Sequence, residues 1–170
     1  MEKIITTFQL RAGRAVLGIG VREIGSCIGV SGAAISIWEH KDNTDNLKTS
    51  DENIILLQKF FEERKIFFPN ESSISLTLNT GITDENYTND TSSLTRFQLR
   101  AARVALNLTQ SELARRIGVS RELITRAERL NNTDYIRPKE VGVATQIRSW
   151  FEKHNICFNN KLSLSLLKSQ

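Results

Sequence analysis

The sequence predicts a mainly α-helical protein in which one folding unit occurs twice, with a short β-hairpin at the end of each copy. Three observations predict this class: an internal repeat, helical spacing of apolar residues between capping residues, and two tails that are apolar at every second position. Hydrophobic residues make up 39% of the 170 residues, which suffices for a packed core. No stretch approaches the roughly 18 consecutive apolar residues of a membrane-spanning helix.

The internal repeat is the strongest of these observations. Residues 8–39 align with residues 97–128 at a constant offset of 89, and 14 of the 32 aligned pairs are identical. The similarity resumes with a shift of one position near the end of each copy, and in the tails Ile74 aligns with Leu162. Self-similarity of this kind indicates a duplicated structural unit.

The repeat sets the domain boundaries. We predict a first unit at residues 1–78, a linker at residues 79–93 and a second unit at residues 94–170. The linker segment is polar and nearly free of apolar residues. Such a composition is typical of a flexible connection between two folded units.

Apolar spacing and capping residues predict the helices of the second unit. Leu99, Ala102 and Leu106 recur at helical spacing and indicate a first helix. Thr109, followed three residues later by a glutamate, forms a capping box that begins a second helix. Gly118 suits the left-handed turn that ends this helix.

The remaining elements follow from similar signals. Ser120 begins a third helix, and Pro138 fits the first turn of a fourth that runs to about residue 154. In the first unit, Thr49 and Glu52 form the matching capping box of the fourth helix. The alternating tails predict strands. Because an isolated hairpin is marginally stable, we expect the four strands to pair with each other or to pack on the helices.

Residues 110–128 carry a pattern that is specific as a whole. Ala114 is small where a second helix passes closely, and Gly118 allows a tight turn. The apolar positions that hold the two helices together are Leu113, Ile117, Val119, Ile124 and Ala127. The pattern resembles the helix-turn-helix of the Xre/Cro (lambda-repressor-like) family of DNA-binding regulators. The first unit keeps the skeleton, so the expected fold is two tandem lambda-repressor-like helix-turn-helix domains, each followed by a hairpin.

The resemblance implies that the third helix enters the major groove of DNA and reads base edges. In the second unit the base-reading positions are Ser120, Arg121, Glu122, Thr125 and Arg126. Arginine suits guanine, glutamate suits cytosine N4, and threonine suits the thymine methyl group. Contacts to DNA phosphates are expected from Gln110, Arg115, Arg116 and Arg129. The alternative interpretation of these arginines is a solvated helix face.

The corresponding surface of the first unit lacks charged residues. Its positions are Ser31, Gly32, Ala33, Ser36 and Ile37. Valine also replaces the glutamine that begins the second helix of the motif. We therefore expect Gly32, Ala33 and Ile37 to contact a protein, either a separate partner or a second copy of the chain.

The resemblance further implies a structural ion pair, between an arginine seven positions before the motif glutamine and the glutamate that ends the reading helix. These residues are Arg103 and Glu128 in the second unit. The first unit keeps both, as Arg14 and Glu39. Because the pair is present where the base-reading side chains are absent, it indicates a structural role.

The net charge of +4 conceals a contrast between the two units. Residues 1–89 carry 9 Lys/Arg and 12 Asp/Glu, whereas residues 90–170 carry 14 and 7. The net charges are therefore −3 and +7. Because contacts to phosphates supply much of the affinity for DNA, we expect the second unit to be the main DNA binder.

The expected function is a bacterial, cytoplasmic, nucleoid-associated transcriptional regulator that binds double-stranded DNA sequence-specifically through the second unit, as a homodimer. One alternative is a pseudo-dimer, in which both units of one chain engage adjacent half-sites. Another is a protein-interaction adaptor or antitoxin-like regulator. The sequence has no glycine-rich phosphate loop, metal-ligand spacing or grouped catalytic residues, so we expect no enzyme, no cofactor and no metal.

Overall fold

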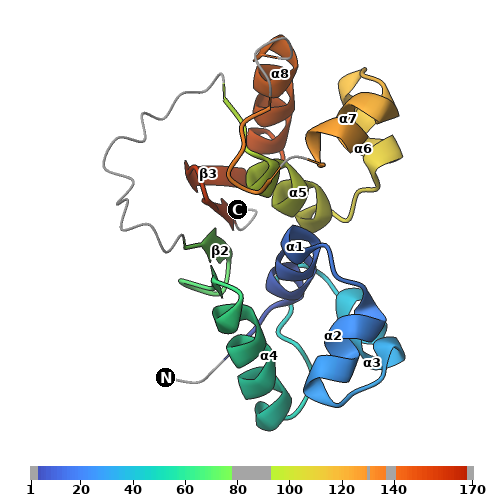
Figure 1. Cartoon of the computed structure of the whole chain (residues 1–170), viewed down its shortest axis with the longest axis vertical. Coiled ribbons are helices and arrows are strands. Elements are labelled where there is room, and N and C mark those ends of the chain that lie inside the picture. Colours follow the sequence, from blue (N-terminus) through green and yellow to red (C-terminus); the bar gives the residue numbers. More distant parts are fainter. Residues whose placement is uncertain (1–3, 78–92, 130, 137–140, 168–170) are drawn as a thin grey trace.

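The structure is a computed structural model that describes residues 4–77, 93–129, 131–136 and 141–167. Within these residues the chain is mainly helical and has one small antiparallel sheet, which confirms the predicted fold class at this level (Figure 1). The predicted linker, up to residue 92, and Pro138 lie outside the described residues. None of the helices described has the length and the hydropathy needed to cross a bilayer.

The same order of four helices and two strands occurs in residues 4–77, here called the first half, and in residues 93–167, the second half. The first half contains α1 (Thr7–Leu17), α2 (Val21–Ile28), α3 (Gly32–Glu39), α4 (Asp51–Glu63), β1 (Ile66–Phe67) and β2 (Ser73–Leu76). The second half contains α5 (Arg96–Ala105), α6 (Gln110–Ile117), α7 (Arg121–Ala127), α8 (Val141–Glu152), β3 (Ile156–Asn160) and β4 (Ser163–Leu166).

Capping residues determine where α6 and α7 begin and end. The hydroxyl of Thr109 accepts a hydrogen bond from the backbone N–H of Glu112 at 3.1 Å, and the Glu112 carboxylate accepts one from the Thr109 N–H at 2.7 Å. Ser120 caps α7, and Gly118 ends α6 in the left-handed conformation with φ of 71°. The three boundaries predicted from the sequence are confirmed.

The predicted capping box at Thr49 and Glu52 is wrong. Ser50 is the N-cap of α4, because its hydroxyl accepts a hydrogen bond from the backbone N–H of Asn53 at 3.3 Å. Thr49 instead accepts a hydrogen bond from the side-chain amide of Asn53 at 2.7 Å. Thr49 and Ser50 are adjacent, and the hydroxyl of either residue could cap the helix. The prediction chose Thr49 because a glutamate follows it three residues later, whereas Ser50 is the cap.

The four strands form one sheet in the order β1-β2-β4-β3, and all neighbours are antiparallel. The strands therefore pair with each other, and the central pair joins the two halves of the chain. In that pair Ile74 lies opposite Leu164. Next to them Ser73 lies opposite Ser165, with the two hydroxyl oxygens 2.8 Å apart.

The sequence alignment of the two tails is wrong by two positions. The first residues of β1 and β3, which are 90 positions apart, pair with Leu76 and Leu166. Ile74 therefore matches Leu164 and not Leu162. Side chains on a strand alternate with a period of two, so a shift of the alignment by two residues leaves the apolar face unchanged. A comparison of the two sequences therefore cannot detect such a shift.

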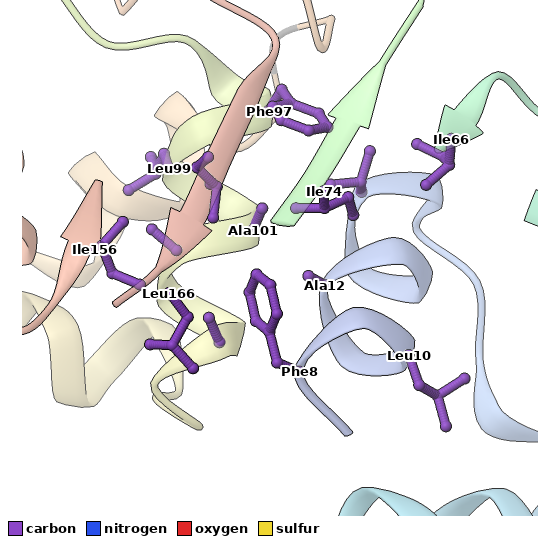
Figure 2. Close-up of a cluster of buried hydrophobic side chains, with 14 of the residues drawn as sticks. Phe8, Leu10, Ala12, Ile66, Ile74, Phe97, Leu99, Ala101, Ile156 and Leu166 are labelled. Atoms are coloured by element: carbon purple, nitrogen blue, oxygen red, sulfur yellow. The ribbon is translucent and has the colours of Figure 1, made fainter. Parts of the chain in front are cut away.

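Helices α1 and α5 pack on each other and share one apolar core with β2 and β4 (Figure 2). Phe8 and Ala12 from α1, and Phe97 and Ala101 from α5, are fully buried in it. The small alanine side chains allow the two helices to approach closely. The core is therefore continuous across the boundary between the halves.

Polar contacts cross the same boundary in both directions. The amide of Asn43 donates a hydrogen bond to the carbonyl oxygen of Ala105, in the last turn of α5. The amide of Asn132 donates to the carbonyl oxygen of Val16, in α1, at 3.3 Å. Arg100 adds a hydrogen bond to another carbonyl near the end of α1 at 3.1 Å. Each half thus supplies side-chain donors to carbonyl oxygens in the last turn of a helix of the other half.

The two short helix pairs lie on one side of the molecule. In Figure 1, α2 and α3 lie at the lower right, α6 and α7 at the upper right, and α1 and α5 between them. The strands lie on the opposite side. Because α1 packs on α5 and β2 pairs with β4, the two helix pairs are held together by a folded core.

Candidate nucleic-acid interface

Helices α6 and α7 form a compact pair around a glycine turn. The backbone N–H of Val119 donates to the carbonyl oxygen of Ala114 at 3.0 Å, which closes the turn after Gly118. The inward-facing residues expected to be buried are buried: Leu113, Ile117, Ile124 and Ala127. Val119 packs against this core while partly exposed.

The five candidate base-reading residues lie together at α7. Arg121, Glu122 and Arg126 are exposed on the helix. Ser120 is exposed too, but its hydroxyl accepts a hydrogen bond from the N–H of Leu123 and serves as the cap. A short helix that presents two guanidinium groups and a carboxylate has the donors and acceptors for base edges in a major groove.

Three of the four candidate phosphate contacts flank this helix. Arg115 and Arg116 lie in the last turn of α6, and Arg129 follows α7; all three are exposed. Gln110 differs from them, because it is partly buried and its side-chain amide bonds within the protein. Exposed cations thus lie on α6 and directly after α7, next to the candidate reading helix, where contacts to DNA phosphates are expected.

Glu128 is the centre of a buried polar network at the base of α7. It is 2% exposed, and its carboxylate accepts two hydrogen bonds from Arg103, one of them at 2.8 Å. The amide of Gln110 donates to the same carboxylate at 2.8 Å. The hydroxyl of Thr125 donates to the Gln110 carbonyl oxygen at 2.9 Å. The network therefore joins α5, α6 and α7.

Sequence reasoning found the ion pair in this network but missed its extension. It assigned Gln110 only to a phosphate and Thr125 only to a base, whereas the structure joins the two side chains. Residues 15 positions apart have no sequence signal that brings them together. Thr125 can still present its methyl group, because only its hydroxyl is engaged.

The first half has the same ion pair without the extension. Arg14 binds the carboxylate of Glu39 through two hydrogen bonds of 2.7 Å and donates a third to the carbonyl oxygen of Ile19 at 2.8 Å. Val21 occupies the position of the glutamine and has no polar group to offer. The structure thus brings together both arginine–glutamate pairs that the sequence analysis expected.

Two glycines bring α3 unusually close to α2. A Cβ atom on Gly25 would lie 2.7 Å from the carbonyl oxygen of Val30. A Cβ atom on Gly32 would lie 2.9 Å from Cγ and 3.1 Å from Cα of Arg22. The first half therefore has no room for a side chain at the position that Arg121 occupies in the second half.

The outer face of α3 is apolar and open to solvent. Ile37, at the position that matches Arg126, is 63% exposed. It lines an open hollow together with Ala33, Ser36, His40 and Lys41. This is the surface for which the sequence analysis expected a protein contact.

The charges of the two helix pairs differ less than those of the two halves. Residues 109–129 carry five arginines and three glutamates, whereas residues 20–41 carry two cations and two glutamates. The acidic residues of the first half gather in part on α4, as Asp51, Glu52, Glu62 and Glu63. The helix pair α2–α3 is therefore neutral rather than acidic.

The capping box of α6 makes stability depend on pH. Two hydrogen bonds from Thr109, first the backbone N–H and then the hydroxyl, lower the pKa of Glu112 below its ordinary value of 4.5. A lowered pKa stabilises the folded state above the ordinary pKa, and this contribution is lost as the pH falls through the lowered value. We expect Glu112→Gln to be less stable than the wild type at neutral pH and equal to it in acid.

Urea unfolding of both proteins over a pH series measures this effect. The difference in the free energy of unfolding should shrink below the ordinary pKa of glutamate. The capping box at Thr95 and Gln98, which begins α5, has no titrating group and provides an internal comparison. A difference that is independent of pH would contradict the assignment.

The described residues include no candidate metal site, and the pKa of Arg11 and that of Arg100 are lowered. No group of three or more His, Cys, Asp or Glu side chains that could hold a metal ion occurs among the described residues. Burial, more than any neighbouring charge, lowers the pKa of Arg11 in the first half and of Arg100, which contacts α1 across the boundary between the halves. Both still carry a positive charge at neutral pH, because arginine titrates far above it.

Comparison with known proteins agrees with the geometry of the second half. The model of a family described as helix-turn-helix matches residues 99–132, which include α6 and α7. This match supports a helix-turn-helix DNA-binding regulator. No curated protein and no solved structure matches the chain.

Proposed function

We propose that this protein is a sequence-specific DNA-binding transcriptional regulator that reads base edges with α7. The observation that carries the proposal is the exposed face of α7, with Arg121, Glu122 and Arg126, in a helix pair that matches a helix-turn-helix family. The flanking cations Arg115, Arg116 and Arg129 support it. In this role the protein needs no cofactor, performs no catalysis and acts in the cytoplasm, at the nucleoid.

We also propose that the chain is a tandem duplication of one helix-turn-helix unit. The repeated order of elements supports this, and so do the matched ion pairs of Arg103 with Glu128 and of Arg14 with Glu39. The two units then sit side by side in one chain, as two protomers do in a dimer. A homodimer of the whole chain stays a prediction. Analytical ultracentrifugation tests it, because a monomer has the mass of one chain of 19.3 kDa and a homodimer has twice that mass.

Arg121→Ala tests the assignment of the reading helix. We expect it to weaken binding to the selected operator by roughly 1–3 kcal/mol and to relax the preference at one base position. Fluorescence anisotropy with operator and scrambled duplexes at fixed salt measures both effects. Unchanged binding of the two duplexes by the variant would show that α7 does not read bases.

Two control variants separate reading from charge. Lys153→Ala removes an exposed cation of the second half outside α6 and α7, and should leave operator binding nearly unchanged. Arg115→Ala should weaken binding to operator and scrambled DNA alike and reduce the salt dependence, as loss of a phosphate contact does. If Lys153→Ala matched Arg121→Ala, net charge rather than base reading would explain the loss.

A second candidate function is a protein-interaction adaptor or antitoxin-like regulator that holds a partner through α3. The specific observation in its favour is the exposed apolar surface at Ala33 and Ile37. In this case binding to DNA would show no sequence preference and would vanish with salt. The variants of α7 would then behave like Arg115→Ala and weaken binding to operator and scrambled DNA alike.

A further inference from the structure

We propose that α3 contacts the same DNA duplex as α7, with Ile37 against thymine methyl groups, so that one chain reads an asymmetric site. The inference rests on the proposed function and extends it to the class of DNA sequence that the protein recognises. One half of the site is read by the polar side chains of α7. The other half is read by the apolar face of α3.

The contacts between the halves relate α3 to α7. Asn43 and Asn132, which are 89 positions apart, each donate to a carbonyl in the last turns of the opposite helix, at Ala105 and Val16. These acceptors are also 89 positions apart. Reciprocal contacts of this kind are characteristic of a two-fold axis.

The sheet has the same reciprocity. The pair of Ile74 with Leu164 lies at its centre. The flanking pairs are Ser73 with Ser165 and Ser75 with Ser163. An offset of 90 positions relates Ser73 to Ser163 and Ser75 to Ser165, so it converts each flanking pair into the other. An axis through this central pair carries α7 onto α3. Both helices lie on the same side of the molecule in Figure 1. When α7 lies in a major groove, α3 therefore faces the same duplex.

The chemistry of α3 selects the base feature that it contacts. Gly32 has no side chain, and the close approach of Arg22 leaves no space for one. The largest exposed side chain of the helix is then Ile37, at the position of Arg126. In the major groove the feature that apolar side chains contact is the C5 methyl group of thymine. The half-site under α3 should therefore prefer thymine.

Charge does not prevent this contact. The helix pair α2–α3 is neutral, and Arg22 and Lys41 are exposed on it and available for phosphates. Helix α4, whose two ends are acidic, packs on α2 and lies on the opposite side of α2 from α3 in Figure 1. The cations of the second half provide most of the phosphate contacts, and α3 is held in place by the shared core.

Selection of bound duplexes from a random pool with the full-length chain gives the first test. The expected result is a non-palindromic site, with defined bases on one side and a thymine-rich segment on the other. A palindrome with two identical half-sites would overturn the inference, because it requires two copies of α7. Absence of any selected sequence would instead refute the proposed function itself.

Replacement of thymine by uracil, which lacks the C5 methyl group, gives the decisive test. Substitution in the half-site under α3 should weaken binding by about fourfold for each methyl group lost from an apolar contact. Ile37→Ala should weaken binding to the thymine duplex by a similar factor and make the variant insensitive to uracil. Ile37→Val, which keeps two methyl groups, should retain most of the sensitivity.

The controls separate this contact from general effects. The same number of uracils outside the footprint should not change the affinity, and circular dichroism should show that the Ile37 variants are folded, since the side chain is exposed. Affinities that ignore both uracil and Ile37→Ala would overturn the inference. The face of α3 would then be free for a protein partner.

Discussion

Replacing Glu128 by alanine should lower the free energy of unfolding by about 3–5 kcal/mol, since it leaves Arg103, whose side chain is only 13% exposed, without its partner. Glu128 is 2% exposed and accepts hydrogen bonds from Arg103 and Gln110. Its loss leaves both partly buried donors without this acceptor. It also releases Thr125, which Gln110 holds on α7. We therefore expect the variant to lose stability and DNA binding together.

Urea unfolding of a double-mutant cycle measures this effect. The double variant Arg103→Ala/Glu128→Ala should lose less stability than the sum of the single variants, because no unpaired charge remains. Glu39→Ala is the matched control in the first half. Its side chain is 12% exposed and binds no glutamine, so we expect a smaller loss. Equal losses at the two sites would contradict the importance of the extended network.

Replacing Phe97 by alanine should also cost about 3–5 kcal/mol, because it leaves a cavity in the core that both halves share. Phe97 is fully buried in the cluster of α1, α5, β2 and β4 (Figure 2). A shared core unfolds as one unit, so the chain should show a single thermal transition. The variant should shift this transition as a whole and should not produce a second one.

Calorimetry of the wild type and four variants tests this. Phe8→Ala, from α1, should behave like Phe97→Ala, and the double variant should depart from additivity, because both rings belong to one cluster. Phe67→Ala is the control, since that ring is 36% exposed at the edge strand β1, and should change the stability little. Two separate transitions would show that the halves fold independently.

Much of the candidate interface was predictable, because local rules determine it. The ends of α6 and the start of α7 depend on Thr109, Gly118 and Ser120, whose side chains or backbone act within a few residues. The exposed arginines follow from helical periodicity. At α4 the same rules failed, because Ser50 and Thr49 compete for one cap and the outcome depends on geometry.

Contacts between distant residues were less predictable. The bond between Gln110 and Thr125 depends on how α6 crosses α7, and the register of Ile74 against Leu164 depends on how two strands slide past each other. A slide of two residues keeps every apolar side chain on the same face. Neither choice changes a local pattern, so neither can be inferred from one.

The sequence by itself determined the mainly helical class, the repeat, the helix pair of the second half and the exposed cations around α7. These properties depend on periodicity, capping and composition, which act over a few residues. Only the tertiary structure decided that the four strands form one sheet within the chain and that α1 packs on α5. The sequence pattern of an apolar helix face or of a strand shows that this surface must pack against a partner. It does not show whether that partner lies in the same chain. The fold answers this question, because burying the two faces against each other completes a single core.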